Sequence, residues 1–262
     1  MSGMQVEFLG TGTSQGVPLI GCTCSVCQSN DARDRRLRCS VLVRHPSAHF
    51  VIDSGPDFRQ QMLRAGVNRL DALLFTHGHK DHIAGTDDVR AFNYLQKKPM
   101  PIYADARVQA ALRREFYYAF EDQRYPGIPE LHLVDIDEEP FDLLGVPVIP
   151  LPVMHLHLPV LGFRIGPFAY MTDANAIPDS TVDRLKGVEV LVLNALRKTP
   201  HPSHFTLDQA LEQVQRIGAQ RTYLTHLSHQ MGLHAEVSSI LPAGVELAYD
   251  GLVLGWEGPS YL

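Results

Sequence analysis

The densest group of metal-binding side chains in the sequence follows a short apolar run at residues 72–75. Three imidazoles and one carboxylate lie within six residues, at His77, His79, Asp81 and His82. Imidazole and carboxylate ligands suit zinc, iron or manganese, and the mixture is typical of centres that activate water. The alternative is a histidine-rich polar turn without a metal, but a structural turn has no reason to contain four ligand-type side chains.

The spacing of these ligands indicates which element holds them. On a helix, His77 and His79 would point to different sides, because residues two apart do not share a helical face. A loop at the end of a strand can bring them together. We therefore expect residues 72–75 to form a strand and the histidines to lie on the loop that follows it.

A second group of ligand-type side chains lies near the N-terminus. The CxCxxC spacing of Cys22, Cys24 and Cys27 can place three thiolates around one tetrahedral ion, with a fourth ligand from elsewhere. Unligated buried cysteines are the alternative. Cys39 stands apart, and we interpret it as a core residue. Four cysteines in 262 residues, three of them clustered, indicate thiolate ligands in a reducing compartment, which favours a cytoplasmic protein.

Further ligand-type residues end later apolar segments. His155 and His157 close one segment, Asp173 follows another, and His226 follows residues 222–225. Open α/β layers place their sites at the ends of strands. Histidine or aspartate therefore occurs repeatedly at the ends of predicted strands, where such a site is expected.

The elements that must position these residues alternate between strands and helices, which indicates a layered α/β fold. With 262 residues and 45% hydrophobic content, a single domain over residues 1–262 is expected. Strands are predicted at 6–9, 40–43, 50–53, 72–75, 101–104, 131–134, 146–151, 161–165, 168–171, 188–193 and 222–225. Helices are predicted at 57–65, ending before Gly66, at 88–96, at 107–120, and after Thr206, where Gln209 completes a capping box.

Charge and hydropathy exclude several classes of protein. A formal net charge of -6 disfavours a nonspecific grip on nucleic acid, which needs a basic face. We find no apolar run that approaches the roughly 18 residues of a membrane span. Residues 1–5 lead directly into a strand without a signal-type segment, which again favours the cytoplasm.

Three other features can serve binding. The glycine-rich residues 10–18 follow a strand and can bring backbone amides close to a phosphate, although such turns are common. Arg90 is either a surface charge or a guanidinium aimed at an anionic substrate. The aromatic residues 116–127 can form a lid or a homodimer contact, and packing is favoured over a ligand-binding role.

The order and spacing of the ligand-type residues resembles the metallo-β-lactamase superfamily over nearly the whole chain. That resemblance implies a four-layer αββα sandwich with two divalent ions, Zn or Mn, at one edge of its sheets. His157 then becomes a group that supports the ligands or faces the substrate, because residues 150–155 match the motif better. The ligands implied are His77, His79 and His155 for one ion and Asp81, His82 and His226 for the other, with Asp173 as the bridge.

A narrower resemblance is to the cyclic phosphate phosphodiesterases of bacterial phosphonate degradation. It rests on residues 9–12, the CxCxxC segment and residues 224–230. It implies a catalytic role for His204, before the late helix, and a counterpart for Arg90. It also implies a structural zinc held by Cys22, Cys24, Cys27 and His229.

These features predict a metallohydrolase that cleaves a small phosphorylated substrate, and the narrower resemblance implies that this substrate is a cyclic phosphate. Two ions roughly 3.5 to 4 Å apart, held by Asp81 and the bridging Asp173, generate a hydroxide at neutral pH. His204 is the expected general acid, because an imidazole titrates near the working pH. Arg90 and the amides of residues 12–16 can stabilise the charge on the phosphate oxygens.

Other functions remain open at this point. A transfer-RNA 3′-end nuclease would share the active site, but it should contain a basic protruding arm, which the sequence lacks. A lactonase or thioesterase would dispense with the phosphate-binding arginine and the acid. A non-catalytic relative from cofactor biosynthesis should have lost ligands, whereas all seven positions are present here.

Overall fold

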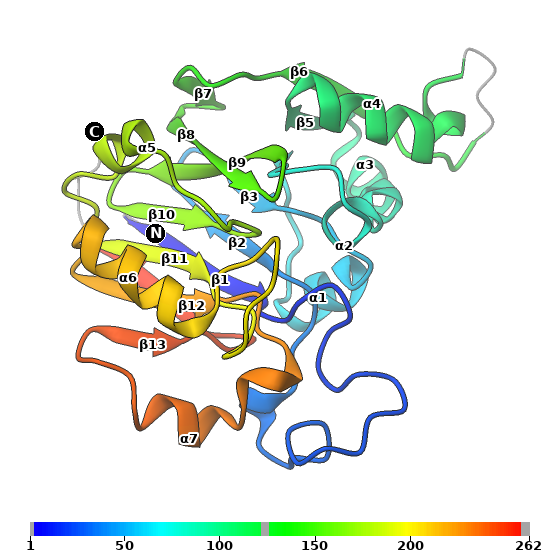
Figure 1. Cartoon of the computed structure of the whole chain (residues 1–262). Helices are drawn as coiled ribbons and strands as arrows, with labels where there is room; N and C mark the ends of the chain where they lie inside the picture. The colour runs from blue at the N-terminus through cyan, green and yellow to red at the C-terminus, as the bar shows by residue number, and fades with distance from the viewer. Residues whose placement is uncertain (1–2, 122–125, 258–262) are drawn as a thin grey trace.

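The computed structural model describes residues 3–121 and 126–257 of the chain. In these ranges two seven-stranded sheets pack face to face, and helices cover the outer face of each sheet (Figure 1). The arrangement confirms the predicted four-layer αββα sandwich.

The first sheet has the strand order β14-β1-β2-β3-β4-β5-β6. Its strands are β1 (Met4–Gly10), β2 (Ser40–Arg44), β3 (His49–Ile52), β4 (Ala72–Leu74), β5 (Met100–Ala104), β6 (Leu131–Asp135) and β14 (Val253–Trp256). Strands β3 to β6 are parallel. The carboxyl ends of β3 and β4 therefore meet at one edge of the sheet.

The second sheet has the order β13-β12-β11-β10-β9-β8-β7. Its strands are β7 (Phe141–Leu143), β8 (Val146–His155), β9 (Leu158–Ile165), β10 (Phe168–Met171), β11 (Val190–Asn194), β12 (Arg221–Thr225) and β13 (Val245–Leu247). Strands β10 to β13 are parallel. Their carboxyl ends again share one edge.

Large apolar side chains fill the space between the two sheets. Phe8 and Phe50 come from the first sheet, Phe163 and Tyr170 from the second, and all four are fully buried. Burial of one such phenylalanine contributes about 1.5–3 kcal/mol. This central layer fixes the two sheets against each other, so that the strand ends of both sheets can contribute to one site.

Helices add a second core layer outside each sheet. Their bounds are α1 (Phe58–Arg64), α2 (Lys80–Ile83), α3 (Arg90–Gln96), α4 (Ala106–Glu115), α5 (Asp179–Arg184), α6 (Leu207–Ile217) and α7 (His234–Ser238), with 3-10 turns η1 (Ala32–Asp34), η2 (Thr86–Val89), η3 (Tyr117–Ala119) and η4 (His229–Met231). Phe58 and Phe92 pack α1 and α3 on the first sheet, and Leu207 and Val237 pack α6 and α7 on the second.

The predicted helix ends are present at α1 and α6. Thr206 accepts the Gln209 N–H, and the Gln209 side chain accepts the Thr206 N–H, which confirms the capping box. Gly66 follows α1 with φ +60°, a conformation that glycine adopts without a steric cost.

Strand β8 is longer than predicted, although prolines interrupt it. Residues 149–155 pair with β9. Pro150 and Pro152 have no N–H to donate, and their nitrogens lie on the edge of β8 that faces away from β9. On that edge their carbonyl oxygens accept hydrogen bonds from Arg184 (2.9 Å) and Thr181 (2.5 Å) of α5. The prolines therefore cost no ladder hydrogen bond, and β8 extends to His155.

Several other elements differ from the expectation. The helix predicted at 107–120 ends at Glu115 and is followed by η3. The histidine loop runs directly into the four-residue α2. Strands β7, β13 and β14 and helices α5 and α7 were not predicted from the sequence.

The aromatic stretch packs partly into the body of the protein. Phe116 and Ala119 belong to the core on the first sheet, whereas Tyr117 is 62% exposed. Tyr125, which was included in the expected lid or dimer contact, lies outside the described residues. In the ranges that the structure covers, the helices are too short or too polar to cross a membrane.

Candidate metal centres and active site

Strands β4, β8, β10 and β12 each direct metal-binding side chains to the same edge of the sandwich. The side chains form two groups of four, and the ligand atoms within each group lie within 4.8 Å of one another. The first group is His77, His79, His155 and Asp173, and the second is Asp81, His82, Asp173 and His226. Asp173 is common to both groups, which is the geometry that a bridging carboxylate requires.

The backbone turns sharply where these strands deliver their ligands. Asp53, Asp173 and His226 follow strands β3, β10 and β12 with φ values of 64°, 59° and 57°. A non-glycine residue in this left-handed region costs about 1–3 kcal/mol and persists only when its surroundings fix it. The strain indicates that the fold holds these three side chains in defined directions.

Asp173 lies between imidazoles of both groups. Its carboxylate oxygens are 3.6 Å from His77 Nε2, 3.5 Å from His82 Nε2 and 3.0 Å from His226 Nδ1. Burial opposes ionisation of Asp173, but the charges of His226 and His82 outweigh it and lower the pKa of Asp173 well below its usual value. The carboxylate is therefore ionised and available as a ligand.

Hydrogen bonds outside the two groups fix the orientation of the imidazoles. His82 Nδ1 lies 2.7 Å from Asp53 Oδ2, and His155 Nδ1 lies 2.8 Å from the carbonyl oxygen of Ser203. The Thr76 hydroxyl donates to Asp53 and lies 3.0 Å from His77 Nδ1. Partners of this kind orient metal-binding histidines and raise their basicity.

Asp53 is a functional candidate that the sequence analysis missed. It is fully buried, and it accepts hydrogen bonds from the Thr76 N–H (2.9 Å) and hydroxyl (2.8 Å). Burial raises its pKa, against the opposing charge of His82. The sequence could have indicated Asp53 through its position, because it is a carboxylate directly after a predicted strand, and the next strand carries the histidine loop.

The donor set fits a divalent cation. Among the described residues, His82 Nε2 and His226 Nδ1 are buried and form no hydrogen bond of suitable geometry, although carboxylate oxygens lie 3.0–3.5 Å away. Burial lowers the pKa of His226, but the charge of Asp173 outweighs it and raises that pKa to about 10. The carboxylates thus create a negative potential around imidazole nitrogens that lack such a hydrogen bond, and a metal ion would satisfy both.

The remaining predicted residues lie at different distances from this centre. The ring of His204 is 4.7 Å from the rings of His155 and His226. His157 is exposed on the turn between β8 and β9, outside both ligand groups. Arg90 pairs with Asp87 at 2.9 Å. The structure therefore brings His204 to the ligands and gives Arg90 a carboxylate partner of its own.

The surroundings of His204 shift its pKa away from the neutral range that the sequence analysis expects. Burial and the charge of His226 lower the pKa of His204 to about 3. Its imidazole is therefore neutral at pH 7, and its Nδ1 has no hydrogen-bond partner among the described residues.

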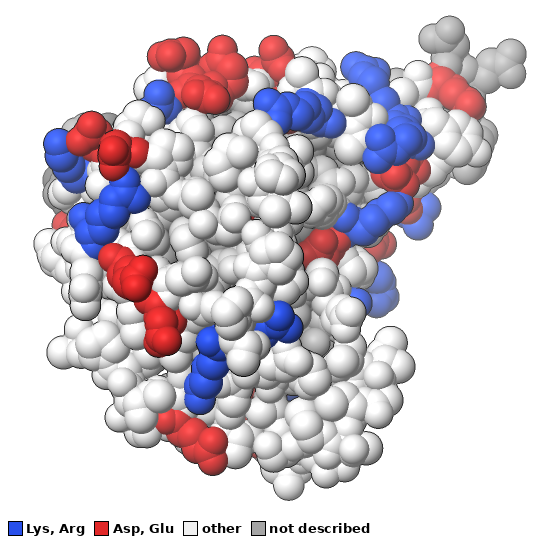
Figure 2. All heavy atoms as spheres, in the orientation of Figure 1, with Lys and Arg blue, Asp and Glu red and all other residues white. Residues whose placement is uncertain are grey.

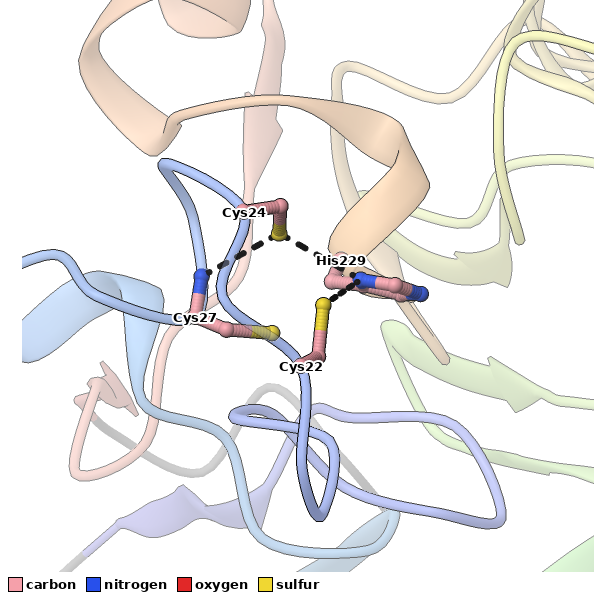
Figure 3. Close-up of side chains that lie close together, drawn as sticks. All are labelled: Cys22, Cys24, Cys27 and His229. Carbon is pink, nitrogen blue, oxygen red and sulfur yellow. Dashed lines mark hydrogen bonds between the residues drawn. The ribbon is translucent and has the colours of Figure 1, made fainter.

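The cysteine segment forms a separate group with His229 (Figure 3). His229 Nδ1 lies 3.3 Å from Cys22 Sγ and 3.4 Å from Cys24 Sγ, and the four ligand atoms lie within 4.8 Å of one another. The Cys27 N–H and His229 lower the pKa of Cys24 to about 6, so that its thiolate is accessible at neutral pH. Three thiolates and one imidazole fit a closed tetrahedral zinc shell.

Comparison with known proteins gives one family match and several similar chains. A family described as "Beta-lactamase superfamily domain" matches residues 48–227. The crystal structure of a new diphosphatase from the PhnP family superposes on this structure with a TM-score of 0.91. The two sequences are 42% identical, and the match covers 97% of each chain.

Two curated relatives have other activities. A ribonuclease Z from Mycobacterium sp. (strain KMS) is 28% identical over 285 residues, which cover 94% of each chain. An octanoyltransferase from Porphyromonas gingivalis is 41% identical over 252 residues, or 95% of this chain. The match covers 51% of that relative, so the chain spans about half its length.

Proposed function

The chain belongs to the metallo-β-lactamase superfamily and, within it, to the PhnP family of hydrolases, and from this premise we propose that it cleaves a small phosphodiester, in particular a cyclic phosphate. The observation that carries the proposal is the pair of four-ligand groups that share Asp173. Two ions a few ångströms apart can stabilise both the attacking and the leaving oxygen of a displacement at phosphorus.

Each ligand has a defined role in this proposal. His77, His79 and His155 would hold one ion, Asp81, His82 and His226 would hold the other, and Asp173, which belongs to both groups, would contribute a carboxylate to each. The imidazole and carboxylate ligands suit zinc or manganese. When bound, such ions activate a water at neutral pH and neutralise charge on the phosphate oxygens.

The residues around the ligands fix the orientation of the ligating imidazoles. Asp53 holds His82 through Nδ1, so that Nε2 faces the site. Ser203 does the same for His155. His204, against His155 and His226, is our candidate for protonating the leaving oxygen, and a neighbouring phosphate anion favours the proton that this role requires.

A second candidate function is hydrolysis of a diphosphate. It is favoured by the 42% identity to a diphosphatase that this chain matches over 97% of its length. Both reactions displace an oxygen from phosphorus, but they differ in the group that leaves. An alkoxide needs a proton, whereas a phosphate leaves without one.

The charge distribution supports a small substrate. The formal net charge is -6, and on the face in Figure 2 acidic and basic side chains are interspersed rather than gathered into one basic field. A polynucleotide partner would gain most of its affinity from such a field. Because one relative is a ribonuclease Z, the test must nevertheless include RNA.

The experiment that tests the function is a substrate panel with metal analysis on the same preparation. The panel contains cyclic phosphates, linear diesters, diphosphates, a transfer-RNA precursor, a lactone and a thioester. We expect hydrolysis of a small cyclic phosphate and about two removable ions besides zinc at the cysteines. Cleavage of only the lactone or thioester would leave the metallohydrolase class and exclude the phosphodiesterase.

Replacement of the bridge tests the metal pair itself. Asp173→Ala should reduce both metal occupancy and turnover, because both groups lose a ligand. An Asp173→Ala protein with full metal content and full activity would contradict the dinuclear assignment.

A further inference from the structure

A cavity of about 540 Å³ lies at the edge of the sandwich opposite to the candidate metal centres. Met4 at the start of β1, Pro167 directly before β10 and Glu189 directly before β11 line it. The candidate ligands Asp173 and His226 instead follow the carboxyl ends of β10 and β12. The cavity is therefore separate from the residues of the proposed function.

Most of the described side chains that line this cavity are apolar, and three can carry a charge. The titratable residues are His45, Arg164 and Glu189. A small number of polar groups in an otherwise apolar cavity of this size is typical of sites for small molecules. The apolar residues are Met4, Val146, Pro147, Ile149, Ile165 and Pro167.

Arg164 brings a positive charge to the cavity without a carboxylate partner in the described chain. Its Nε donates to the Gly166 carbonyl (3.0 Å), and its Nη1 donates to the carbonyls of Arg184 (2.6 Å) and Lys186 (2.9 Å). Its Nη2 has no acceptor among the described residues. Neutral acceptors therefore hold the guanidinium in place, and Nη2 remains available to donate to a carboxylate.

Glu189 brings a negative charge to the same cavity. It is half-buried, and the indole N–H of Trp256 donates to its Oε2 (3.3 Å). Within the described ranges no lysine or arginine forms an ion pair with Glu189, and this includes Arg164. Two opposite charges that share a cavity without pairing can each bind the opposite charge of a ligand.

Backbone contacts hold the two charged residues beside one turn, residues 166–167. The Glu189 N–H donates to the Pro167 carbonyl (2.9 Å), and the neighbouring Gly166 carbonyl accepts from Arg164. Lys186, which also accepts from Arg164, precedes Glu189 by three residues. A single small ligand can therefore contact both side chains.

His45 adds a polar group to the cavity but no third charge. Burial lowers the pKa of His45, so that its ring is neutral at pH 7. Its Nδ1 accepts the Ser47 N–H (3.2 Å), which places the proton of the neutral ring on Nε2. The described lining thus carries one positive and one negative charge, and the carboxylate of Glu189 would repel a phosphate dianion.

We propose that this cavity binds a small zwitterion with an apolar body, of the class of free amino acids with apolar side chains. Arg164 binds the carboxylate, Glu189 binds the ammonium group, and the apolar wall contacts the side chain. The site is distinct from the proposed active site, so it can be tested without knowing which substrate is hydrolysed.

The first test titrates the metal-loaded, full-length protein with phenylalanine. Trp256 is the single tryptophan of the sequence and contacts Glu189, so its fluorescence reports occupancy of the cavity. Calorimetry on the same samples detects binding that leaves the indole unchanged. If phenylalanine binds by neither measurement, the proposal is overturned.

Three analogues show which parts of the ligand are recognised. 3-Phenylpropanoate lacks the ammonium group, 2-phenylethylamine lacks the carboxylate, and glycine lacks the apolar body. Each should bind roughly 10-fold or more weakly than phenylalanine, because each loses a hydrogen bond between charged groups or the burial of a side chain. Equal affinities for phenylalanine and 3-phenylpropanoate would overturn the proposal.

Two variants assign the recognition to the named residues. Glu189→Gln keeps an acceptor for Trp256 and removes the charge. It should weaken binding of phenylalanine roughly 10-fold without weakening that of 3-phenylpropanoate. Arg164→Gln should weaken both of these ligands. Because Arg164 also holds carbonyls at the end of α5, Glu189→Gln is the decisive variant if Arg164→Gln folds poorly.

Arg221→Gln is the matched control. Arg221 is exposed at the start of β12, and its backbone N–H donates to the Glu189 carbonyl (2.9 Å), but its side chain does not line the cavity. This variant should bind phenylalanine as the wild type does. Equal losses in Arg221→Gln and Arg164→Gln would show a general effect of charge and overturn the proposal.

Discussion

At the scale of single residues, Asp53 shows how a residue that is not itself a candidate ligand can orient one of the candidate ligands. Its carboxylate is fully buried and contacts His82 Nδ1 at 2.7 Å. Partners of this kind raise the basicity of the histidine that they orient. Asp53 should therefore influence how strongly the second group would bind an ion.

This gives a prediction for Asp53→Asn, which removes the negative charge and preserves the size of the side chain. Metal affinity should fall roughly 10- to 100-fold. The measurement is the metal content after dialysis against graded concentrations of chelator. Asp183→Asn is the control, because that carboxylate is 66% exposed on α5. Equal retention in both variants would show that Asp53 has only a packing role.

His204 gives a second prediction, which concerns the leaving group. His204→Ala should keep both ions and slow cleavage of substrates with alkoxide leaving groups by about 10²- to 10⁴-fold, the usual worth of general acid catalysis. A nitrophenyl diester should be affected much less, because nitrophenolate leaves without a proton. If both substrates slow equally, His204 binds phosphate or supports structure instead.

The residues of the site differ in how well a sequence can reveal them. His77, His79, Asp81 and His82 are conspicuous because four ligand-type side chains rarely crowd into one turn. Asp53 has an ordinary local context, and its partner His82 lies 29 positions away. Only the folded chain shows that Asp53 adjoins the candidate ligands.

At the scale of elements, the strands that could be predicted are those with continuous apolar runs. β10 and β11 are buried along their whole length, and their patterns are unambiguous. Strands β7 and β13 have three residues each, too few for a period to be recognised. The prolines of β8 hid its length, because their compatibility with a strand depends on which edge they face.

The cysteine segment and η4 form an element pair that yields a third prediction. Cys24→Ser should remove zinc and lower the melting temperature by several degrees, since each kcal/mol is worth about 2–4 °C in a large domain. The rate at which the variant cleaves a small phosphodiester should change little, whereas its melting temperature should fall. Ser25→Ala, in the same loop, is the control. Unchanged zinc content and melting temperature in Cys24→Ser would contradict a structural zinc.

At the scale of the whole molecule, a buried polar network joins the two ends of the described chain. Arg36 donates to the Thr11 hydroxyl (2.8 Å) and to the Ala248 carbonyl (2.5 Å), and its Nη2 lies 3.1 Å from His234 Nδ1. Asp250 accepts from the hydroxyl of Thr11 (2.8 Å). Because β1 also pairs with β14, the first and last parts of the fold support each other.

The fourth prediction concerns the pH dependence of stability. Burial and the charges of Arg36 and Arg33 lower the pKa of His234 to about 4, while Asp31 and Asp34 oppose the shift. The unfolded chain therefore binds the proton first as pH falls. The contribution of His234 to stability is complete above about pH 6.5 and is lost as the pH falls toward 4.

The measurement is the free energy of unfolding of wild type and His234→Gln between pH 4 and 7.5. The glutamine oxygen can accept from Arg36 but does not titrate, so the variant should lose less stability on acidification. Metal release in acid affects both proteins alike and cancels in the difference. Parallel curves would show that His234 does not contribute.

The cysteine group also has a consequence for the order in which the protein can be completed. Cys22 and His229 are 207 positions apart in the chain, so the shell closes a loop of nearly the whole protein. During synthesis the three thiols emerge long before their imidazole partner exists. If the group binds zinc as we propose, its four ligands can come together only after β12 has been made, so zinc would join the C-terminal segment to the N-terminal loop late in synthesis.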